Sequence, residues 1–114
     1  MLFVPYAFNT ERPADYDQLE HVANVGQEAL RRTSGKSYQV GQASRLLYEA
    51  AGGSDDWAKA KAGIKYSYTF ELRDKGSQGF LLSARQIEDT CTEIVAAVKA
   101  MLITSAEMDR RAEE

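Results

Sequence analysis

Apolar and polar residues alternate most regularly in the stretch KYSYTFELRD, which occupies positions 65–74. Aromatic and aliphatic side chains take one parity and polar ones the other: Tyr66, Tyr68, Phe70 and Leu72 against Ser67, Thr69, Glu71 and Arg73. Such a period of two predicts a β-strand over residues 65–73 with one buried face. Glu71 then lies on the polar face, either as an ordinary solvated carboxylate or as one held rigidly to transfer protons. These residues alone leave both interpretations open.

Two other segments carry the spacing of amphipathic helices. Behind Pro13, which suits a first helical turn, apolar residues three and four apart predict a helix to about Arg32, ended by Gly35. A second helix follows Ser83, which forms a capping-box pattern with Gln86. Its expected buried stripe consists of Ile87, Cys91, Ile94, Val95, Val98 and Leu102.

Shorter elements are expected in the rest of the chain. The apolar residues 2–4 predict a buried strand that stops at Pro5, whereas periodicity does not assign residues 38–48. The Gly-Gly pair at 52–53 predicts a turn, after which Ser54 can cap a short helix. Strands and helices mix in order, so the predicted fold class is α/β.

Composition restricts the partners that the chain can have. A length of 114 residues, 44% of them hydrophobic, is enough for one core and ordinarily one domain. The net charge is −3 and no basic run interleaves with aromatic residues, so no nucleic-acid partner is expected. The apolar stretches are too short to span a bilayer, so no membrane partner is expected, and the N-terminal residues lack the pattern of a signal peptide.

The sequence contains few residues that could bind a transition metal. His21 is the only histidine and Cys91 the only cysteine. A catalytic zinc site takes three protein ligands, so no such site is predicted within this chain. His21 is expected at the surface, and Cys91 is expected to be a packing residue on a buried helix face.

A series of ordered motifs carries a resemblance to a known family. Leu47-Tyr48, AGGSDDW at 51–57, GIKYSYTFELRDKG at 63–76 and GFLL at 79–82 closely resemble the C-terminal part of zinc metallocarboxypeptidases of the pancreatic A/B type. Within this type, the chain resembles the carboxypeptidase B-like members. The resemblance implies that residues 1–114 are a single partial domain, part of a three-layer αβα sandwich with a mixed sheet. Such enzymes release single residues from peptide C-termini with a zinc-bound water.

The resemblance also assigns roles to individual residues. Glu71 matches the general base, and Tyr48 matches a mobile tyrosine that donates a hydrogen bond to the substrate. The matching substrate-binding positions are Ala7, Ala43, Leu47, Ala50, Asp55, Thr69 and Phe80. Asp55 falls at the floor of the specificity pocket, where a carboxylate implies a preference for C-terminal lysine or arginine. From the residues alone, Asp55 could instead cap the helix before Trp57.

Parts of the family pattern have no counterpart in this chain. The His-x-x-Glu pair and later histidine that bind zinc lie upstream of the segment that Met1 matches, as do the substrate-binding arginines. We therefore expect zinc only in the complete enzyme, and no activity from this chain alone. The expected partners are peptide or protein C-termini and the missing N-terminal half of the catalytic domain, and the half-sheet is expected to self-associate. The family implies secretion. The alternative is a catalytically inactive truncated protein that binds peptides or proteins.

Overall fold

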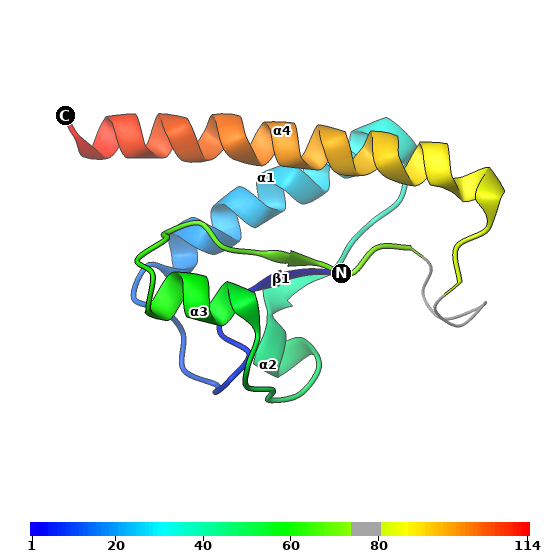
Figure 1. Ribbon diagram of the computed structural model, residues 1–114. Helices are drawn as coiled ribbons and strands as arrows, with labels where there is room; N and C mark the ends of the chain where they lie inside the picture. The colour runs from blue at the N-terminus through cyan, green and yellow to red at the C-terminus, as the bar shows by residue number, and fades with distance from the viewer. Residues whose placement is uncertain (74–80) are drawn as a thin grey trace.

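The computed structural model describes residues 1–73 and 81–114. Figure 1 shows the elements in chain order: β1 (Leu2–Val4), α1 (Tyr16–Ser34), β2 (Val40–Gln42), α2 (Ala43–Leu46), α3 (Ser54–Ala60), β3 (Thr69–Phe70), the 3-10 turn η1 (Ala84–Gln86) and α4 (Ile87–Ala112). Helices α1 and α4 lie on one side of the strands, and α2 and α3 lie on the other (Figure 1). The predicted α/β class is confirmed. In the described part of the chain, every helix is too short or too polar to cross a bilayer.

The strands form a small mixed sheet in the order β2-β1-β3. Strand β1 pairs in parallel with β2 and antiparallel with β3, with Leu2 opposite both Val40 and Phe70. The predicted strand at residues 2–4 is confirmed, but the strand predicted over residues 65–73 is too long. Because β1 has only three residues, it pairs with little more than Thr69–Phe70, and the only further backbone bonds of this pairing in the described residues are those between Glu71 and Met1.

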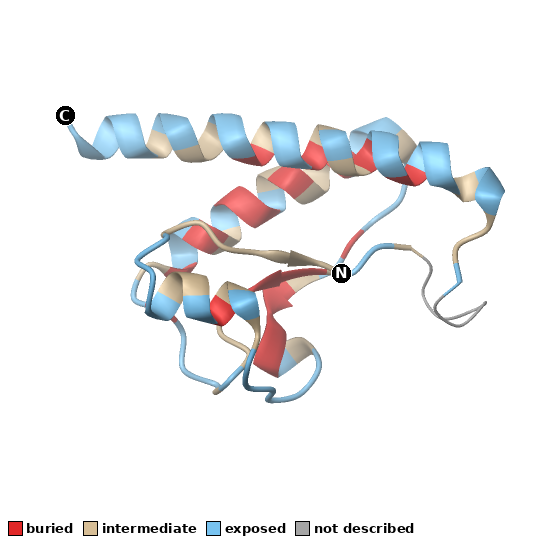
Figure 2. Ribbon diagram, viewed as in Figure 1, coloured by how far each residue is buried: buried red, intermediate tan, exposed pale blue. Residues whose placement is uncertain are grey.

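Helix α1 agrees with its sequence pattern. It buries the expected apolar positions, among them Leu19, Val22 and Leu30, against the sheet and α4 (Figure 2). Gly35 ends it with a φ of 75°, and its N–H donates to the Arg31 carbonyl at 2.7 Å. This left-handed conformation is inexpensive only for glycine.

Helix α4 buries a different face from the one predicted. The residues that it buries are Thr90, Glu93, Ala97 and Met101. The expected stripe is wrong: Ile87, Val95, Val98 and Leu102 are 39–66% exposed, Cys91 is exposed and Ile94 is half-buried. Helix α1 packs on the face of α4 that carries Ala97, because Ala97 on α4 and Gly26 on α1 are small enough for the two helices to approach closely. The apolar stripe is left without cover among the described residues.

Neither predicted helix cap forms as expected. Ser83 precedes the 3-10 turn η1 rather than α4, and its hydroxyl donates to the side chain of Gln86 at 3.4 Å instead of to a backbone N–H. Ser54 is the first residue of α3, whose N-cap is Gly53 without any side-chain capping bond. Ser83 is thus the N-cap residue of η1 but makes no side-chain bond to a backbone N–H, whereas α3 begins one residue earlier than predicted and includes Ser54 in its first turn.

A buried ion pair joins the end of the β3 segment to α4. The guanidinium of Arg73 donates to the Glu93 carboxylate, and the side chains are 11% and 0% exposed. The Tyr38 hydroxyl donates to the other carboxylate oxygen at 2.9 Å. Burial raises the pKa of Glu93, but the bonds from Arg73 and Tyr38 outweigh it and hold the pKa below its usual value. Burial and the neighbouring Glu93 raise the pKa of Tyr38 to about 12.

Substitution of Gly26 tests the close packing of α1 and α4. A Cβ at this position would lie 2.6 Å from both Cγ and Sδ of Met101. We expect Gly26→Val to lower the free energy of unfolding by about 1–3 kcal/mol through overpacking. Urea denaturation measures this, and the loss should shrink when Met101→Ala makes room. An equal loss in both backgrounds would show that the helix contact is not the cause.

Substitution of Glu93 tests the buried ion pair. At neutral pH, Glu93→Gln should cost about 3–5 kcal/mol, because it leaves Arg73 buried without its charge partner. Since the folded-state pKa of Glu93 is depressed, the pair stabilises the fold above the usual value of 4.5 and loses this effect as pH falls through the folded value. Denaturation at several pH values should therefore show the two proteins converging in acid.

The exposed carboxylate Glu28 provides the control for this experiment. It pairs with Arg31 at 2.6 Å on the surface of α1, where solvent weakens the interaction. Glu28→Gln should therefore change stability little at any pH. A loss as large as that of Glu93→Gln would contradict the assigned importance of burial.

Candidate active site

The loop that follows β1 is held by a buried carboxylate of α3. The N–H of Ala7 donates to both carboxylate oxygens of Asp56, at 3.1 and 3.0 Å, and the N–H of Phe8 donates to one of them at 2.9 Å. Asp56 is 5% exposed. Burial raises its pKa, although the two backbone N–H groups act in the opposite direction. The sequence analysis assigned no role to Asp56, because nothing local indicates a partner almost fifty residues away.

A buried glutamine holds the same loop from the side of β2. The amide nitrogen of Gln42 donates to the carbonyls of Glu11 at 2.7 Å and of Tyr6 and Asn9 at 3.3 Å, and Gln42 is 1% exposed. Its amide oxygen accepts a bond from Arg45 at 3.0 Å. The sequence analysis missed this residue too, since it lies in the stretch that periodicity left unassigned.

Backbone hydrogen bonds bring several predicted pocket positions together. The Ala50 N–H donates to the Ala7 carbonyl at 2.8 Å, and the N–H of Ser44, next to Ala43, donates to the Tyr6 carbonyl at 3.3 Å. The β1 loop, α2 and the turn after α2 are thus joined at this end of the sheet. Three of the predicted pocket positions on these segments are alanines: Ala7 is half-buried, Ala43 is buried and Ala50 is exposed.

Asp55 lies at the start of α3 in the same region. It is half-buried, and the Ser67 hydroxyl donates to its backbone carbonyl at 2.9 Å. A Cβ at Gly53 would lie 2.7 Å from Asp55 Oδ1, so the glycine makes room for the carboxylate. Because α3 has no side-chain cap, Asp55 does not serve as one.

The polar parity of the 65–73 segment faces this region. Ser67 reaches α3, whereas Tyr66, Tyr68 and Phe70 line a groove on the opposite side. Thr69, which pairs with Phe3, shares the side of Ser67 and is half-buried.

Glu71 follows directly after β3 and is exposed. Its backbone N–H donates to the Met1 carbonyl at 2.8 Å, and its carbonyl accepts a bond from the Met1 nitrogen at 2.7 Å. The backbone that carries this carboxylate is therefore held by Met1, the residue directly before β1. By strand alternation, its side chain leaves the sheet on the side of Thr69.

The remaining predicted site residues are less closely tied to the pocket. Tyr48 and Leu47 follow α2 and are 71% and 49% exposed. They precede the Gly-Gly turn, in which Gly52 has a φ of 91°. Phe80 lies outside the described residues.

The described residues do not fit a zinc site. Within residues 1–73 and 81–114, no three His, Cys, Asp or Glu side chains are arranged to hold a metal ion. His21 on α1 and Cys91 on α4 are both exposed, and they stand on different helices. The burial predicted for Cys91 is thus wrong, since the face of α4 that carries it turns away from α1.

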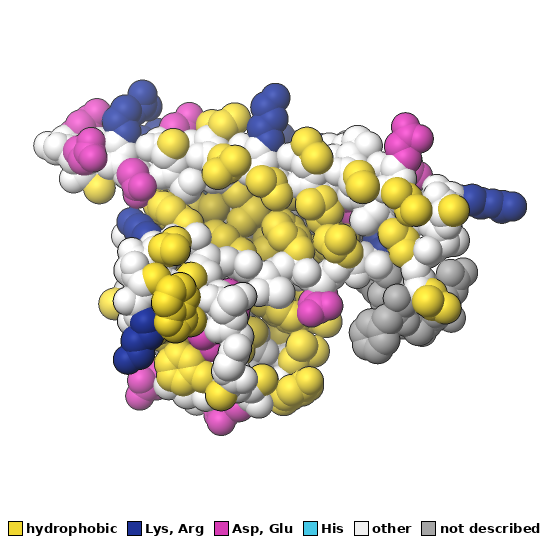
Figure 3. Space-filling model, viewed as in Figure 1, with side chains coloured by type: hydrophobic (Ala, Val, Ile, Leu, Met, Phe, Trp, Pro, Cys, Tyr) yellow, Lys and Arg dark blue, Asp and Glu magenta, His cyan; other side chains and the backbone are white. Residues whose placement is uncertain are grey.

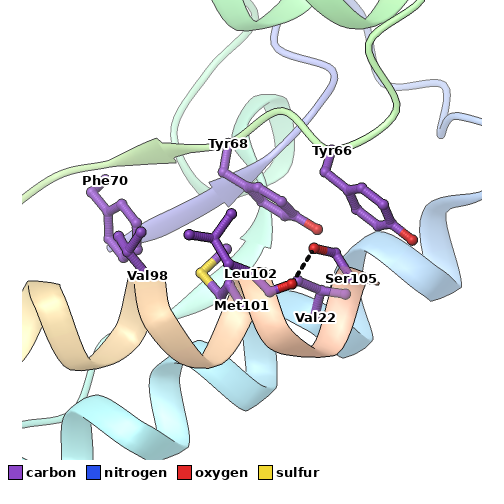
Figure 4. Close-up of a pocket in the computed structure, with 8 residues that line it drawn as sticks. All are labelled: Val22, Tyr66, Tyr68, Phe70, Val98, Met101, Leu102 and Ser105. Atoms are coloured by element: carbon purple, nitrogen blue, oxygen red, sulfur yellow. Dashed lines mark hydrogen bonds between the residues drawn. The ribbon is translucent and has the colours of Figure 1, made fainter. Parts of the chain in front are cut away.

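A second feature is an apolar groove between α4 and the segment that leads into β3. Apolar side chains gather there over a wide area of the face in Figure 3. The groove has a volume of about 200 Å³ and is lined by Val22, Tyr66, Tyr68, Phe70, Val98, Met101, Leu102 and Ser105 (Figure 4). Figure 4 shows the three aromatic rings directed toward α4. Leu102 remains 65% exposed, so the groove is open.

Comparisons with curated proteins agree with the motifs. Carboxypeptidase B from Astacus astacus is 43% identical over 97 residues, which are 85% of this chain and 32% of that protein. Carboxypeptidase A2 from Mus musculus is 43% identical over 102 residues, which are 90% of this chain and 24% of that protein. The chain therefore spans about a quarter to a third of the length of these relatives.

Solved structures confirm the fold. Bovine thrombin-activatable fibrinolysis inhibitor, in complex with tick carboxypeptidase inhibitor, has a TM-score of 0.86 at 40% identity, over 96% of this chain and 36% of that one. Carboxypeptidase A from Helicoverpa armigera has a TM-score of 0.79 at 30% identity, over 93% of this chain and 27% of that one. The family model for zinc carboxypeptidases matches residues 1–97. With its motifs, fold and relatives in agreement, this chain belongs to the zinc carboxypeptidase family.

Proposed function

We propose that the protein carrying this chain is a zinc-dependent exopeptidase that releases single C-terminal residues, with a preference for lysine and arginine. In this proposal residues 1–114 are one part of the catalytic domain and supply its general base, mobile tyrosine and specificity pocket. The observation that carries the proposal is Asp55, a half-buried carboxylate that does not cap its helix and lies among segments rich in alanine.

Substrate preference has to be argued from the pocket rather than from overall similarity. Relatives named carboxypeptidase B and carboxypeptidase A2 are equally similar to the chain, at 43% identity. A carboxylate in a partly desolvated pocket attracts a cationic side chain and is left without a partner by an apolar one. The side chains of Ala7, Ala43 and Ala50 are small, which in this proposal leaves room in the pocket for the long side chain of lysine or arginine.

Glu71 is proposed as the base that accepts a proton from the attacking water. Its backbone is fixed by two hydrogen bonds to Met1, and a base held in this way keeps its geometry through the reaction. Tyr48 is proposed to move onto bound substrate and donate a hydrogen bond, for which its 71% exposure and the neighbouring glycines give it freedom.

Zinc, which family membership implies, would act as a Lewis acid when bound. Because the described residues do not fit it, and because the whole sequence holds a single histidine and a single cysteine, we propose that its ligands lie in another part of the complete enzyme, and we expect this chain alone to be inactive. Secretion is part of the same proposal and is supported by family membership alone.

The partner proposed for the apolar groove is the rest of the catalytic domain. Strand β3 lies at the edge of the sheet, directly beside the groove, so a further strand could pair there while its neighbours cover Val98 and Leu102. The relatives are long enough to supply such a segment, since the matched part is 24–32% of their length. Without it, the same surface favours self-association.

Asp55 is tested in the complete protein that carries this chain. Cleavage of peptides ending in Arg, Lys, Leu or Phe should favour Arg and Lys by at least about a hundredfold, which corresponds to the 3–5 kcal/mol lost when a buried charge loses its partner. Asp55→Ile should reverse this preference. Glu71→Gln should abolish cleavage of every peptide.

Two results would contradict the proposal in different ways. A preference for Leu or Phe that Asp55→Ile leaves unchanged would remove the lysine and arginine specificity but not the peptidase activity. A complete protein that binds such peptides without cleaving them would favour the inactive binding module instead.

The groove is tested by comparing the complete protein with residues 1–114 alone. Leu102→Asp should cost several kcal/mol in the complete protein, where a buried carboxylate would lack a partner, roughly as expected for such groups. In the isolated chain, where Leu102 is 65% exposed, the change should be small and should reduce self-association.

The matched control is Thr92→Asp, which adds the same charge at an exposed position of α4 outside the groove. It should have little effect on either protein. If Leu102→Asp is equally harmless in the complete protein, the groove is not covered there.

A further inference from the structure

We propose that Asp56 is a positioning residue for the specificity pocket, holding the wall at Ala7 at a fixed distance from the floor at Asp55. This inference rests on the proposed function and extends it to a residue that touches no substrate. Its basis is the set of three N–H to carboxylate contacts, at 2.9–3.1 Å, that Asp56 receives from Ala7 and Phe8.

The hydrogen bonds between Asp56 and the loop fix the position of the loop closely. A buried carboxylate that accepts backbone N–H groups makes short, charge-assisted hydrogen bonds. Asp56 is 5% exposed, so water competes little for these bonds. The loop cannot slide along α3 without breaking all of them.

Ala7 is held from both sides of its own backbone. Its N–H is bound by Asp56, and its carbonyl accepts the N–H of Ala50 at 2.8 Å. A methyl group cannot adapt to a ligand by changing rotamer, so the position of the wall that Ala7 contributes is fixed by the position of its backbone.

The floor of the pocket is attached to the same anchor. Asp55 precedes Asp56 in the chain, and consecutive Cα atoms are about 3.8 Å apart. The Ser67 hydroxyl holds the Asp55 carbonyl at 2.9 Å, and Gly53 leaves space for its carboxylate. The two adjacent aspartates therefore have separate tasks: Asp55 faces the substrate, and Asp56 sets the width of the pocket.

The two tasks can be separated by the same substitution at neighbouring positions. In the complete protein, Asp56→Asn introduces an amide N–H₂ against the loop N–H groups, so at least one contact is lost. We expect KM to rise roughly 10- to 100-fold for peptides ending in Arg and in Leu alike, with kcat nearly unchanged, because a displaced wall removes binding contacts that the ground state and the transition state share. Asp55→Asn should instead weaken cleavage of Arg and Lys peptides selectively.

Hydrogen exchange supplies a readout independent of catalysis. The amides of Ala7 and Phe8 should exchange faster in Asp56→Asn and at the wild-type rate in Asp55→Asn. If Asp56→Asn does not fold, Asp56→Glu keeps the charge and displaces the loop by its extra methylene. It should still raise KM.

The outcomes distinguish this inference from the proposed function. Wild-type preference for Arg and Lys, with unchanged KM and unchanged exchange of Ala7 and Phe8 in the Asp56 variants, overturns the positioning role alone. A wild-type protein that cleaves no C-terminal residue overturns the proposed function and this inference together. Faster exchange with a selective loss of Arg cleavage in Asp56→Asn would also overturn it, since the residue would then act as a substrate charge.

Discussion

Strand β1 is the central strand of the sheet, and the segments of the candidate site are positioned by their attachment to it or to the residues next to it. Although it has only three residues, it pairs with β2 on one edge and β3 on the other, and α1 packs behind it. Met1, which precedes β1, holds the backbone of Glu71 by two hydrogen bonds, and the chain continues from the other end of β1 into the loop of Ala7. All three of its residues are buried, so hydrophobic burial compensates for a ladder too short to be stable by itself.

Side chains of the 65–73 segment alternate between the two faces of the sheet, so one set packs beside the helices and the other lies beside the candidate pocket. Side chains of one parity, Tyr66, Tyr68 and Phe70, face the helices, while Ser67 reaches the start of α3 on the other side. Successive residues of this segment therefore line the apolar groove on one side of the sheet and lie beside the proposed pocket on the other. The carboxylates follow the same division by environment: Asp56 and Glu93 are buried with N–H and guanidinium donors, whereas Asp55 and Glu71 keep access to solvent.

The differences between expectation and structure have a common physical origin. The apolar residues of the predicted stripe on α4 have the spacing of one helix face, yet α1 packs on a different face, which carries Ala97 and Met101. Periodicity reports that some face will be buried, but not by which partner. The matched residues are only 24–32% of the length of the relatives, and in the proposed function the rest of the catalytic domain covers this stripe.

The sequence by itself determined the family, the α/β class, the extent of α1 and the alternation of side chains along the segment that contains β3, because these depend on local spacing and ordered motifs. The tertiary structure alone decided that Asp56 anchors the loop, that Gln42 supports it and that Glu93 is buried against Arg73. These roles depend on hydrogen bonds between residues 20 to 49 positions apart. A buried polar group must find its partners wherever the folded chain places them, and no local pattern records where that will be.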